Sequence, residues 1–182
     1  MRCFLALDLP APVRNYLDRT ARESLRKGKV KWVVPDQLHV TLVFAGEVEG
    51  ETASALRDAM LAVAARPLTL ALNGLGHFPP RGEPRVIWAG LSGDTDDLVR
   101  LQDALATRAE AAGVTRDKRP FTPHITLGRV KSPFGAYAIP DELQEVGPTL
   151  RDKPFVASRL TLYESELSRQ GSIYRVVARR DL

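Results

Sequence analysis

One tetrapeptide occurs twice in the chain, as His-Val-Thr-Leu at residues 39–42 and as His-Ile-Thr-Leu at residues 124–127. The two copies start 85 positions apart, close to half of the 182 residues. Each copy lies in an alternating stretch typical of a β-strand, and each follows a helical segment and a loop that contains proline. A repeat at this spacing indicates a duplicated structural unit. We therefore predict one bilobal domain over residues 1–182, with pseudo-twofold related lobes that each contribute one such strand.

Alternation along a strand determines which side chains of each copy share a face. His39 and Thr41 project to one side of the first strand, and the apolar side chains of that copy project to the other. The second copy repeats this arrangement with His124 and Thr126. If the two lobes face one another, two imidazoles and two hydroxyls converge on one site, while the apolar residues anchor each strand in the core.

The rest of the chain mixes helical and extended patterns. Apolar spacing of three to four residues predicts helices over residues 12–26, 52–65 and 95–112. Alternation predicts strands over residues 2–9, 38–44, 68–75, 85–91, 125–130, 155–164 and 172–178, the last two as a hairpin across 168–171. A turn is expected at 27–31, and irregular structure over the proline-containing segment 131–153. No regular strand-helix-strand period is present, so we expect an α+β fold with antiparallel or mixed sheets rather than a doubly wound parallel sheet.

Composition excludes several classes of protein. Hydrophobic residues make up 44% of the chain and charged residues 26%, which excludes disordered and fibrous proteins. Apolar runs are too short to cross a bilayer, and Asp8 with two prolines interrupts the first 20 residues, so we expect a cytoplasmic protein without membrane contact. The single cysteine, Cys3, excludes an intrachain disulfide and a cysteine-built zinc site. The pattern shows no exposed apolar helix, so we expect a monomer.

The two histidines can divide the acid–base work of breaking a phosphodiester bond. An imidazole titrates near neutrality, so one can take a proton from the incoming oxygen while the other gives one to the departing oxygen. The threonine hydroxyls can bond the non-bridging oxygens of the phosphate. This chemistry requires no metal ion or other cofactor. A zinc site, which needs three or four protein ligands, and a covalent phosphohistidine, which does not need paired threonines, are alternatives that the pattern favours less.

The paired His-x-Thr-Leu motifs resemble the signature of the two-histidine (2H) phosphoesterase superfamily. Within it, the chain is most similar to the bacterial and archaeal RNA 2′,3′-cyclic phosphodiesterases, also called 2′-5′ RNA ligases. The similarity extends over segments 2–7, 32–46, 76–90, 119–129 and 162–167. It implies a bilobal α+β fold with two facing antiparallel sheets, outer helices and a basic cleft between the sheets.

The resemblance also implies an activity and the residues that carry it. Family members open a terminal 2′,3′-cyclic phosphate on RNA to a 2′-phosphate, and can join or cut 2′-5′ linkages reversibly without ATP or metal. Carried onto this sequence, His39 would be the general acid for the 3′ oxygen and His124 the general base that activates water. Thr41 and Thr126 would hold the phosphate. The opposite assignment of the two histidines is the alternative, because a near-symmetric site can be used in either direction.

Basic residues gather around the second motif. Five of them lie within 16 positions: Arg116, Lys118, Arg119, Arg129 and Lys131. They predict a positive rim that can contact an RNA backbone, and a solvated loop face is the alternative. Arg129 is the first candidate for substrate binding because it lies near the strand end, where a long side chain can reach back over the cleft. Arg119 is a second candidate.

Three phenylalanines are candidates for stacking on a base, because single-stranded RNA ends are commonly held in this way. Strict alternation sends Phe44 to the core face, and a bulge near Ala45-Gly46 would turn it to the cleft. Phe121 and Phe134 lie in predicted loops near the second motif.

Two rival functions remain beside RNA 3′-end hydrolysis. A non-catalytic RNA-binding module is disfavoured, because the aromatic-rich signatures of such modules are absent while an acid–base pair is present. A 2H phosphoesterase that acts on a small cyclic or 2′-5′-linked nucleotide is scarcely separated from the RNA enzyme by sequence.

Overall fold

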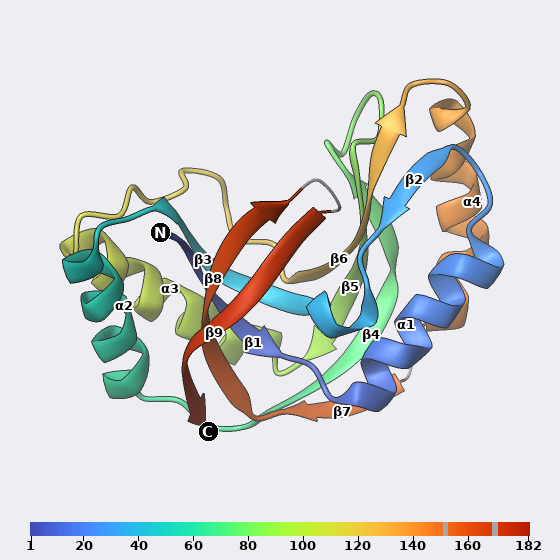
Figure 1. Ribbon diagram of the computed structural model, residues 1–182. Coiled ribbons are helices and arrows are strands. Elements are labelled where there is room, and N and C mark those ends of the chain that lie inside the picture. Colours follow the sequence, from blue (N-terminus) through green and yellow to red (C-terminus); the bar gives the residue numbers. More distant parts are fainter. Residues whose placement is uncertain (151–152, 169–170) are drawn as a thin grey trace.

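In the computed structural model, which describes residues 1–150, 153–168 and 171–182, the chain forms nine strands, four α-helices and three short 3-10 helices (Figure 1). The strands are β1 (Arg2–Asp8), β2 (Lys29–Trp32), β3 (His39–Glu47), β4 (Leu68–Phe78), β5 (Val86–Gly93), β6 (His124–Ser132), β7 (Lys153–Ala157), β8 (Arg159–Ser168) and β9 (Gly171–Asp181). The helices are α1 (Ala11–Ser24), α2 (Gly50–Ala62), α3 (Thr95–Ala111) and α4 (Ile139–Val146). The 3-10 turns are η1 (Pro35–Gln37), η2 (Ala136–Ala138) and η3 (Gly147–Leu150).

The strands form two antiparallel sheets. A four-stranded sheet has the order β3-β1-β8-β9 and is called the His39 sheet below; a five-stranded sheet has the order β2-β6-β5-β4-β7 and is called the His124 sheet. Helices α2 and α3 pack on the His39 sheet, and α1 and α4 pack on the His124 sheet (Figure 1). Buried apolar residues of both sheets belong to one core cluster. The predicted α+β fold with antiparallel sheets is confirmed.

Neither sheet is built from one half of the chain. Strand β4, from the first half, pairs with β7 from the second, and β8, from the end of the chain, pairs with β1. Helix α1 follows β1 but packs near β2 and β6, and α3 follows β5 but packs on β3. The two tetrapeptide strands nevertheless lie in different sheets and contact one another.

Three sequence-based expectations are wrong in detail. The predicted turn over 27–31 contains β2, an edge strand that is stable because it pairs with β6 and leaves its two lysines toward solvent. The irregular segment 131–153 contains α4, which tolerates Pro140 because the first helical turn needs no N–H donor there. The single strand predicted over 155–164 breaks at Ser158 into β7 and β8, which belong to different sheets. Residues 169 and 170 of the predicted hairpin turn lie outside the described residues.

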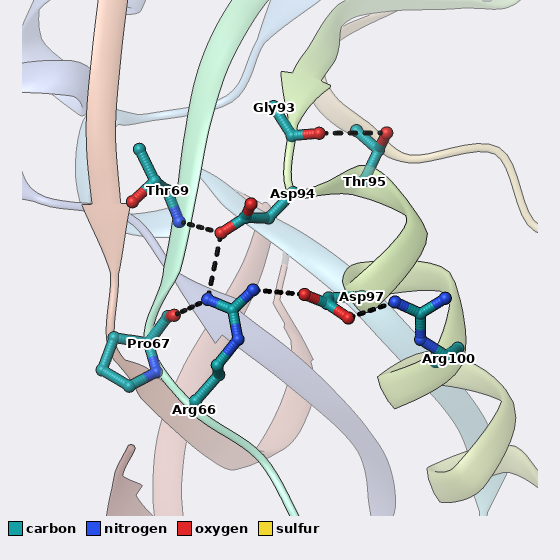
Figure 2. Close-up of polar contacts among 8 residues, drawn as sticks. All are labelled: Arg66, Pro67, Thr69, Gly93, Asp94, Thr95, Asp97 and Arg100. Atoms are coloured by element: carbon teal, nitrogen blue, oxygen red, sulfur yellow. Dashed lines mark hydrogen bonds and ion pairs between the residues drawn. The ribbon is translucent and has the colours of Figure 1, made fainter.

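A polar network fixes the point where the chain leaves the His124 sheet for α3 (Figure 2). Arg66, just before β4, donates to the carboxylates of Asp94 and Asp97 in the turn and first helical residues after β5. Asp94 also accepts the backbone N–H of Thr69 at 2.9 Å, and Asp97 pairs with Arg100. These bonds hold the start of α3 against β4, and α3 then runs across to support β3.

None of the helices in the described part of the chain combines the length and the apolar character that a bilayer crossing requires.

Candidate active site

The two tetrapeptide strands have the same pattern of burial. In β3 and in β6, the histidine and threonine are half-buried while the apolar residues between and after them are buried. The face carrying His39 and Thr41 is therefore partly open, and the opposite face is core, as alternation predicts. The same holds for His124 and Thr126.

Each strand contains a bulge at the last residue of its tetrapeptide. Against β1, Thr41 pairs with Ala6 and Val43 with Leu5, which leaves Leu42 as the extra residue. Against β5, Thr126 pairs with Trp88 and Gly128 with Ile87, which leaves Leu127 as the extra residue. A bulge shifts the alternation of everything that follows it.

The bulges decide where the fifth residue after each histidine lies. Phe44 is 53% exposed, on the face of its histidine, so the expectation that strict alternation sends it to the core is wrong. The predicted bulge at Ala45-Gly46 does exist as a second register shift, but the shift at Leu42 precedes Phe44 and redirects it. Arg129 is exposed on the corresponding position of β6.

Backbone carbonyls hold both imidazoles in one tautomer. The Nδ1 atom of His39 lies 2.7 Å from the carbonyl oxygen of Gln37, and that of His124 lies 2.6 Å from the carbonyl oxygen of Thr122. Since a carbonyl only accepts, each Nδ1 carries hydrogen and each Nε2 is the nitrogen that gains or loses a proton. The Nε2 atom of His39 lies 2.9 Å from Oγ1 of Thr41, whose hydroxyl donates to it when the imidazole is neutral.

Aromatic rings surround both histidines. Phe4 stacks on His39 at a centroid distance of 4.9 Å, and Tyr174 meets it edge-on at 5.7 Å. Tyr163 stacks on Phe4 at 5.2 Å and extends this cluster along the His39 sheet. On the other side, Phe78 meets His124 edge-on at 5.0 Å, and Trp88 lies at 6.3 Å. The rings restrict water around both imidazoles.

This shielding lowers the pKa of both histidines. Burial is the main cause of the lowered pKa of His39; the bond to the Gln37 carbonyl and the charge of Asp8 oppose it, and positive charge on His124 lowers it further. Burial also lowers the pKa of His124, against the bond to the Thr122 carbonyl. The charge of His124 thus acts on the pKa of His39.

A carboxylate accompanies His39 but not His124. Asp8 is the Cα partner of His39 on β1, and its carboxylate accepts the hydroxyls of Thr161 at 2.8 Å and Tyr163 at 3.0 Å. The corresponding partner of His124 on β5 is Gly90. A Cβ atom at Gly90 would lie 2.5 Å from the carbonyl oxygen of Asn73, so this position has no room for a side chain.

The other predicted binding residues lie in varied settings. Phe121 is half-buried against the core, and Phe134 is 89% exposed in the turn after β6. Arg119 is exposed and its guanidinium binds both oxygens of Asp117. Burial raises the pKa of Tyr174 on β9, and the positive charge of Arg129 on β6 opposes that rise.

Five residues beside the histidines were not predicted from the sequence. They are Phe4, Asp8, Phe78, Tyr163 and Tyr174. Phe4, Phe78 and Tyr163 lie in segments that carry the family resemblance, and this resemblance was the one sequence feature that could have indicated a role at the site. Their positions beside the histidines depend on strand pairing.

Among the described residues, no three His, Cys, Asp or Glu side chains are grouped as ligands for a metal ion.

The two antiparallel sheets, each with a His-x-Thr strand at the site, define the fold of a 2H phosphoesterase. The model of the 2′-5′ RNA ligase superfamily matches residues 10–169, and the chain belongs to this family. The resemblance inferred from the motifs is confirmed.

Curated relatives and solved structures support membership of this family. The RNA 2′,3′-cyclic phosphodiesterase of Archaeoglobus fulgidus is 35% identical over 131 residues, which cover 72% of this chain and 73% of the relative. That of Escherichia coli is 31% identical over 178 residues, covering 98% of this chain and 94% of the relative. The crystal structure of E. coli LigT complexed with 3′-AMP matches with a TM-score of 0.82 at 29% identity, covering 100% of this chain and 97% of that one.

Proposed function

We propose that this chain opens the 2′,3′-cyclic phosphate at the 3′ end of RNA to a 2′-phosphate, without a metal ion or other cofactor. The observation that carries the proposal is a pair of neighbouring imidazoles whose Nδ1 atoms are fixed by backbone carbonyls, which leaves both Nε2 atoms for proton exchange. The relatives named RNA 2′,3′-cyclic phosphodiesterases support the same reaction.

The proposed step needs one proton donor and one proton acceptor. A water oxygen attacks the phosphorus while the Nε2 atom of His124 takes one of its protons. The bond from phosphorus to the ribose 3′ oxygen breaks, and protonated His39 gives its Nε2 proton to that oxygen. The products are a 3′ hydroxyl and a 2′-phosphate monoester, and proton exchange with solvent restores both imidazoles.

Asp8 supports this assignment of acid and base. Its negative charge favours the protonated form of His39 against the effect of burial, which is the main cause of the lowered pKa. His124 has a glycine at the corresponding position, so no side chain there favours its protonated form. Asp8 therefore offsets part of the effect of burial at His39, and no side chain does so at the corresponding position beside His124.

The threonines and the residues after the bulges would hold the substrate. Thr41 and Thr126 share the faces of the histidines and would donate to the non-bridging oxygens, where negative charge grows in the transition state. A phosphate bound between the imidazoles also raises the pKa of both, because opposite charge favours the protonated forms. Arg129 would bind a phosphate and Phe44 would stack on a base, with Phe121, Phe134 and Arg119 as outer contacts.

Ligation follows from the same chemistry. When the 5′ hydroxyl of a second RNA takes the place of water, attack on the cyclic phosphate releases the 3′ oxygen and leaves a 2′-5′ linkage. The cyclic ester supplies the reactive bond, so ATP is not consumed. The reverse reaction exchanges the roles of the two imidazoles.

The test is an assay in EDTA with an oligonucleotide that ends in a 2′,3′-cyclic phosphate, followed by identification of the product isomer. We expect a 2′-phosphate that disappears in His39→Ala and in His124→Ala. A requirement for added metal, or a 3′-phosphate product, contradicts the proposal. Adenosine 2′,3′-cyclic phosphate in a parallel assay tests the alternative of a small nucleotide substrate, which predicts faster turnover of the mononucleotide than of the oligonucleotide.

We also expect the chain to act as a monomer in the cytoplasm. Sedimentation at assay concentration tests the first expectation, and cell fractionation tests the second.

A further inference from the structure

A cavity of about 510 Å³ opens beside His39, a volume typical of small-ligand sites. Its walls come from β1, the first turn of α1, the segment that precedes β3, and strands β8 and β9, and residues of the His124 sheet do not line it. In Figure 1 these elements gather where α1 approaches the front strands of the His39 sheet. The cavity is thus an extension of the site on the side of one histidine only.

Three arginines line the cavity, and they differ in what they already bind. Arg159 donates from Nε to the carboxylate of Asp181 at 2.7 Å, so one of its guanidinium donors is already hydrogen-bonded. Arg14 reaches Asp36 only at 3.5 Å, and the Nε atom of Arg14 is buried without a partner. Arg179 has no hydrogen bond or ion pair with any residue of the described chain, and it lines the cavity together with Tyr163.

The acidic residues of the cavity do not neutralise both of these arginines. The carboxylate of Asp8 accepts the hydroxyls of Thr161 and Tyr163, one on each oxygen, and within the described residues it forms no ion pair with Arg14 or Arg179. Asp36 has a side chain that is 93% exposed, and its one ion pair among the described residues is the long contact to Arg14. Donors of Arg14 and Arg179 therefore remain available, and a guanidinium is the side chain best suited to bind two oxygens of a phosphate.

The direction of the proposed reaction determines which part of the substrate reaches this cavity. The departing 3′ oxygen lies on the side of the acid, His39, so the ribose that carries the cyclic phosphate also lies there. Its 5′ oxygen points away from the reacting phosphorus, farther along the same side. We infer that Arg14 and Arg179 form a subsite for the phosphate on the 5′ oxygen of the terminal nucleotide, an inference that rests on the proposed function.

The test compares two substrates that differ only in this phosphate. They are adenosine 2′,3′-cyclic phosphate, with a free 5′ hydroxyl, and adenosine 5′-phosphate 2′,3′-cyclic phosphate. We expect the wild-type kcat/KM to be about tenfold or more higher for the 5′-phosphorylated substrate, because charge-assisted bonds to a phosphate are strong. A dinucleotide ending in the cyclic phosphate, which carries a 5′ diester, should share the preference if the subsite serves RNA.

Arg14→Ala and Arg179→Ala should each reduce this ratio toward one. The ratio of the two kcat/KM values within one variant does not depend on how much of the protein is folded, so a stability defect cannot imitate the result. Arg22→Ala, on the same helix as Arg14, and Arg175→Ala, on the same strand as Arg179, are matched controls because they pair with Asp18 and Glu166 instead. Both controls should keep the wild-type ratio.

The outcomes separate this inference from the proposed function. A wild-type ratio near one, or a ratio that survives both substitutions, overturns the subsite while cyclic phosphate hydrolysis stands. If neither substrate nor the cyclic oligonucleotide is hydrolysed, the proposed function itself fails.

Discussion

Strands β3 and β6 bend in the same way, yet they lie among different neighbours. In both strands the last residue of the tetrapeptide is a bulge, and a carbonyl two residues before the histidine binds its Nδ1 atom. Two residues after the bulge, β3 carries Phe44 and β6 carries Arg129. The strand beside each histidine differs too, with Asp8 opposite one and Gly90 opposite the other.

The comparison separates what the repeat supplies from what its surroundings supply. The repeated backbone places an imidazole and a hydroxyl on each side of the site. In the proposed function the neighbours give the two sides different roles: the Asp8 carboxylate favours the protonated form of His39, and Arg129 would bind a phosphate near His124. Four predictions test this division, beginning with the largest effect.

The two histidines should respond differently to a better leaving group. On cyclic-phosphate RNA, His39→Ala and His124→Ala should each lower kcat by roughly 10²–10⁴. On a phosphodiester of 4-nitrophenol, whose phenolate departs without a proton, His39→Ala should recover most of its loss while His124→Ala should not. Steady-state rates with both substrates measure the difference.

The control is His77→Ala, which changes the one histidine outside the two tetrapeptides and should retain wild-type rates. Recovery in His124→Ala instead of His39→Ala would reverse the assignment of acid and base.

The two threonines should matter about equally for the transition state. Thr41→Val and Thr126→Val each remove one donor to the phosphate and should lower kcat by about 10–10³, with smaller changes in KM. The conservative variants Thr41→Ser and Thr126→Ser keep the hydroxyl and should retain most activity. If either valine variant is as active as wild type, that side does not hold the phosphate.

The residues after the bulges should differ in their response to salt. Arg129→Ala should raise KM for a cyclic-phosphate oligonucleotide about tenfold and reduce the salt dependence by about one unit of slope. Phe44→Ala should raise KM about fivefold at every salt concentration, because stacking does not depend on counterion release. The ring of Phe44 has the Arg2 guanidinium 5.0 Å from its centroid, and its exposure leaves surface for a base.

Phe44→Tyr preserves the ring and is the matched control. Equal salt slopes in the two alanine variants would contradict the difference between the sheets.

The smallest expected effect concerns pH. Because burial lowers the pKa of both histidines below 6.5, the bell-shaped profile of kcat/KM should peak below pH 6.5. Asp8→Asn removes a charge that opposes this lowering at His39, so the limb on which His39 loses its proton should move to lower pH. Activity at pH 7.5 should then fall about two- to fivefold.

The titratable groups that face His39 from the packed strands are Asp8, Tyr163, Tyr174 and His124, and Asp8 is the one carboxylate among them. Glu47→Gln, at the far end of β3, is the control and should leave the profile in place. A shift of the alkaline limb to higher pH in Asp8→Asn would contradict the role of the carboxylate.

Local patterns made the central part of the site predictable. The tetrapeptides, their strand alternation and the helices over 52–65 and 95–112 are short-range signals, and the structure places elements close to each of them. Phe44 was assigned to the wrong face because the bulge at Leu42 arises from the register with β1, which no local pattern shows.

The environment of His39 was beyond prediction for a related reason. The bonds from Thr161 and Tyr163 to Asp8 join residues 153 and 155 positions apart. The break at Ser158 sends β7 and β8 to different sheets, and only the assembled fold shows which sheet receives Tyr163. Likewise, only the fold shows that Gly90 pairs with His124 and that Asn73 leaves no room for a side chain at this position.

The interleaved order of the strands also sets when the site is complete during synthesis. Strand β1 leaves the ribosome early, but its neighbour β8 and the outer strand β9 are translated last. Until they emerge, Phe4 and His39 lack the tyrosines that shield them, and Asp8 lacks both hydroxyls that fix it. The surroundings of His39 are thus complete only after β8 and β9 have paired with β1.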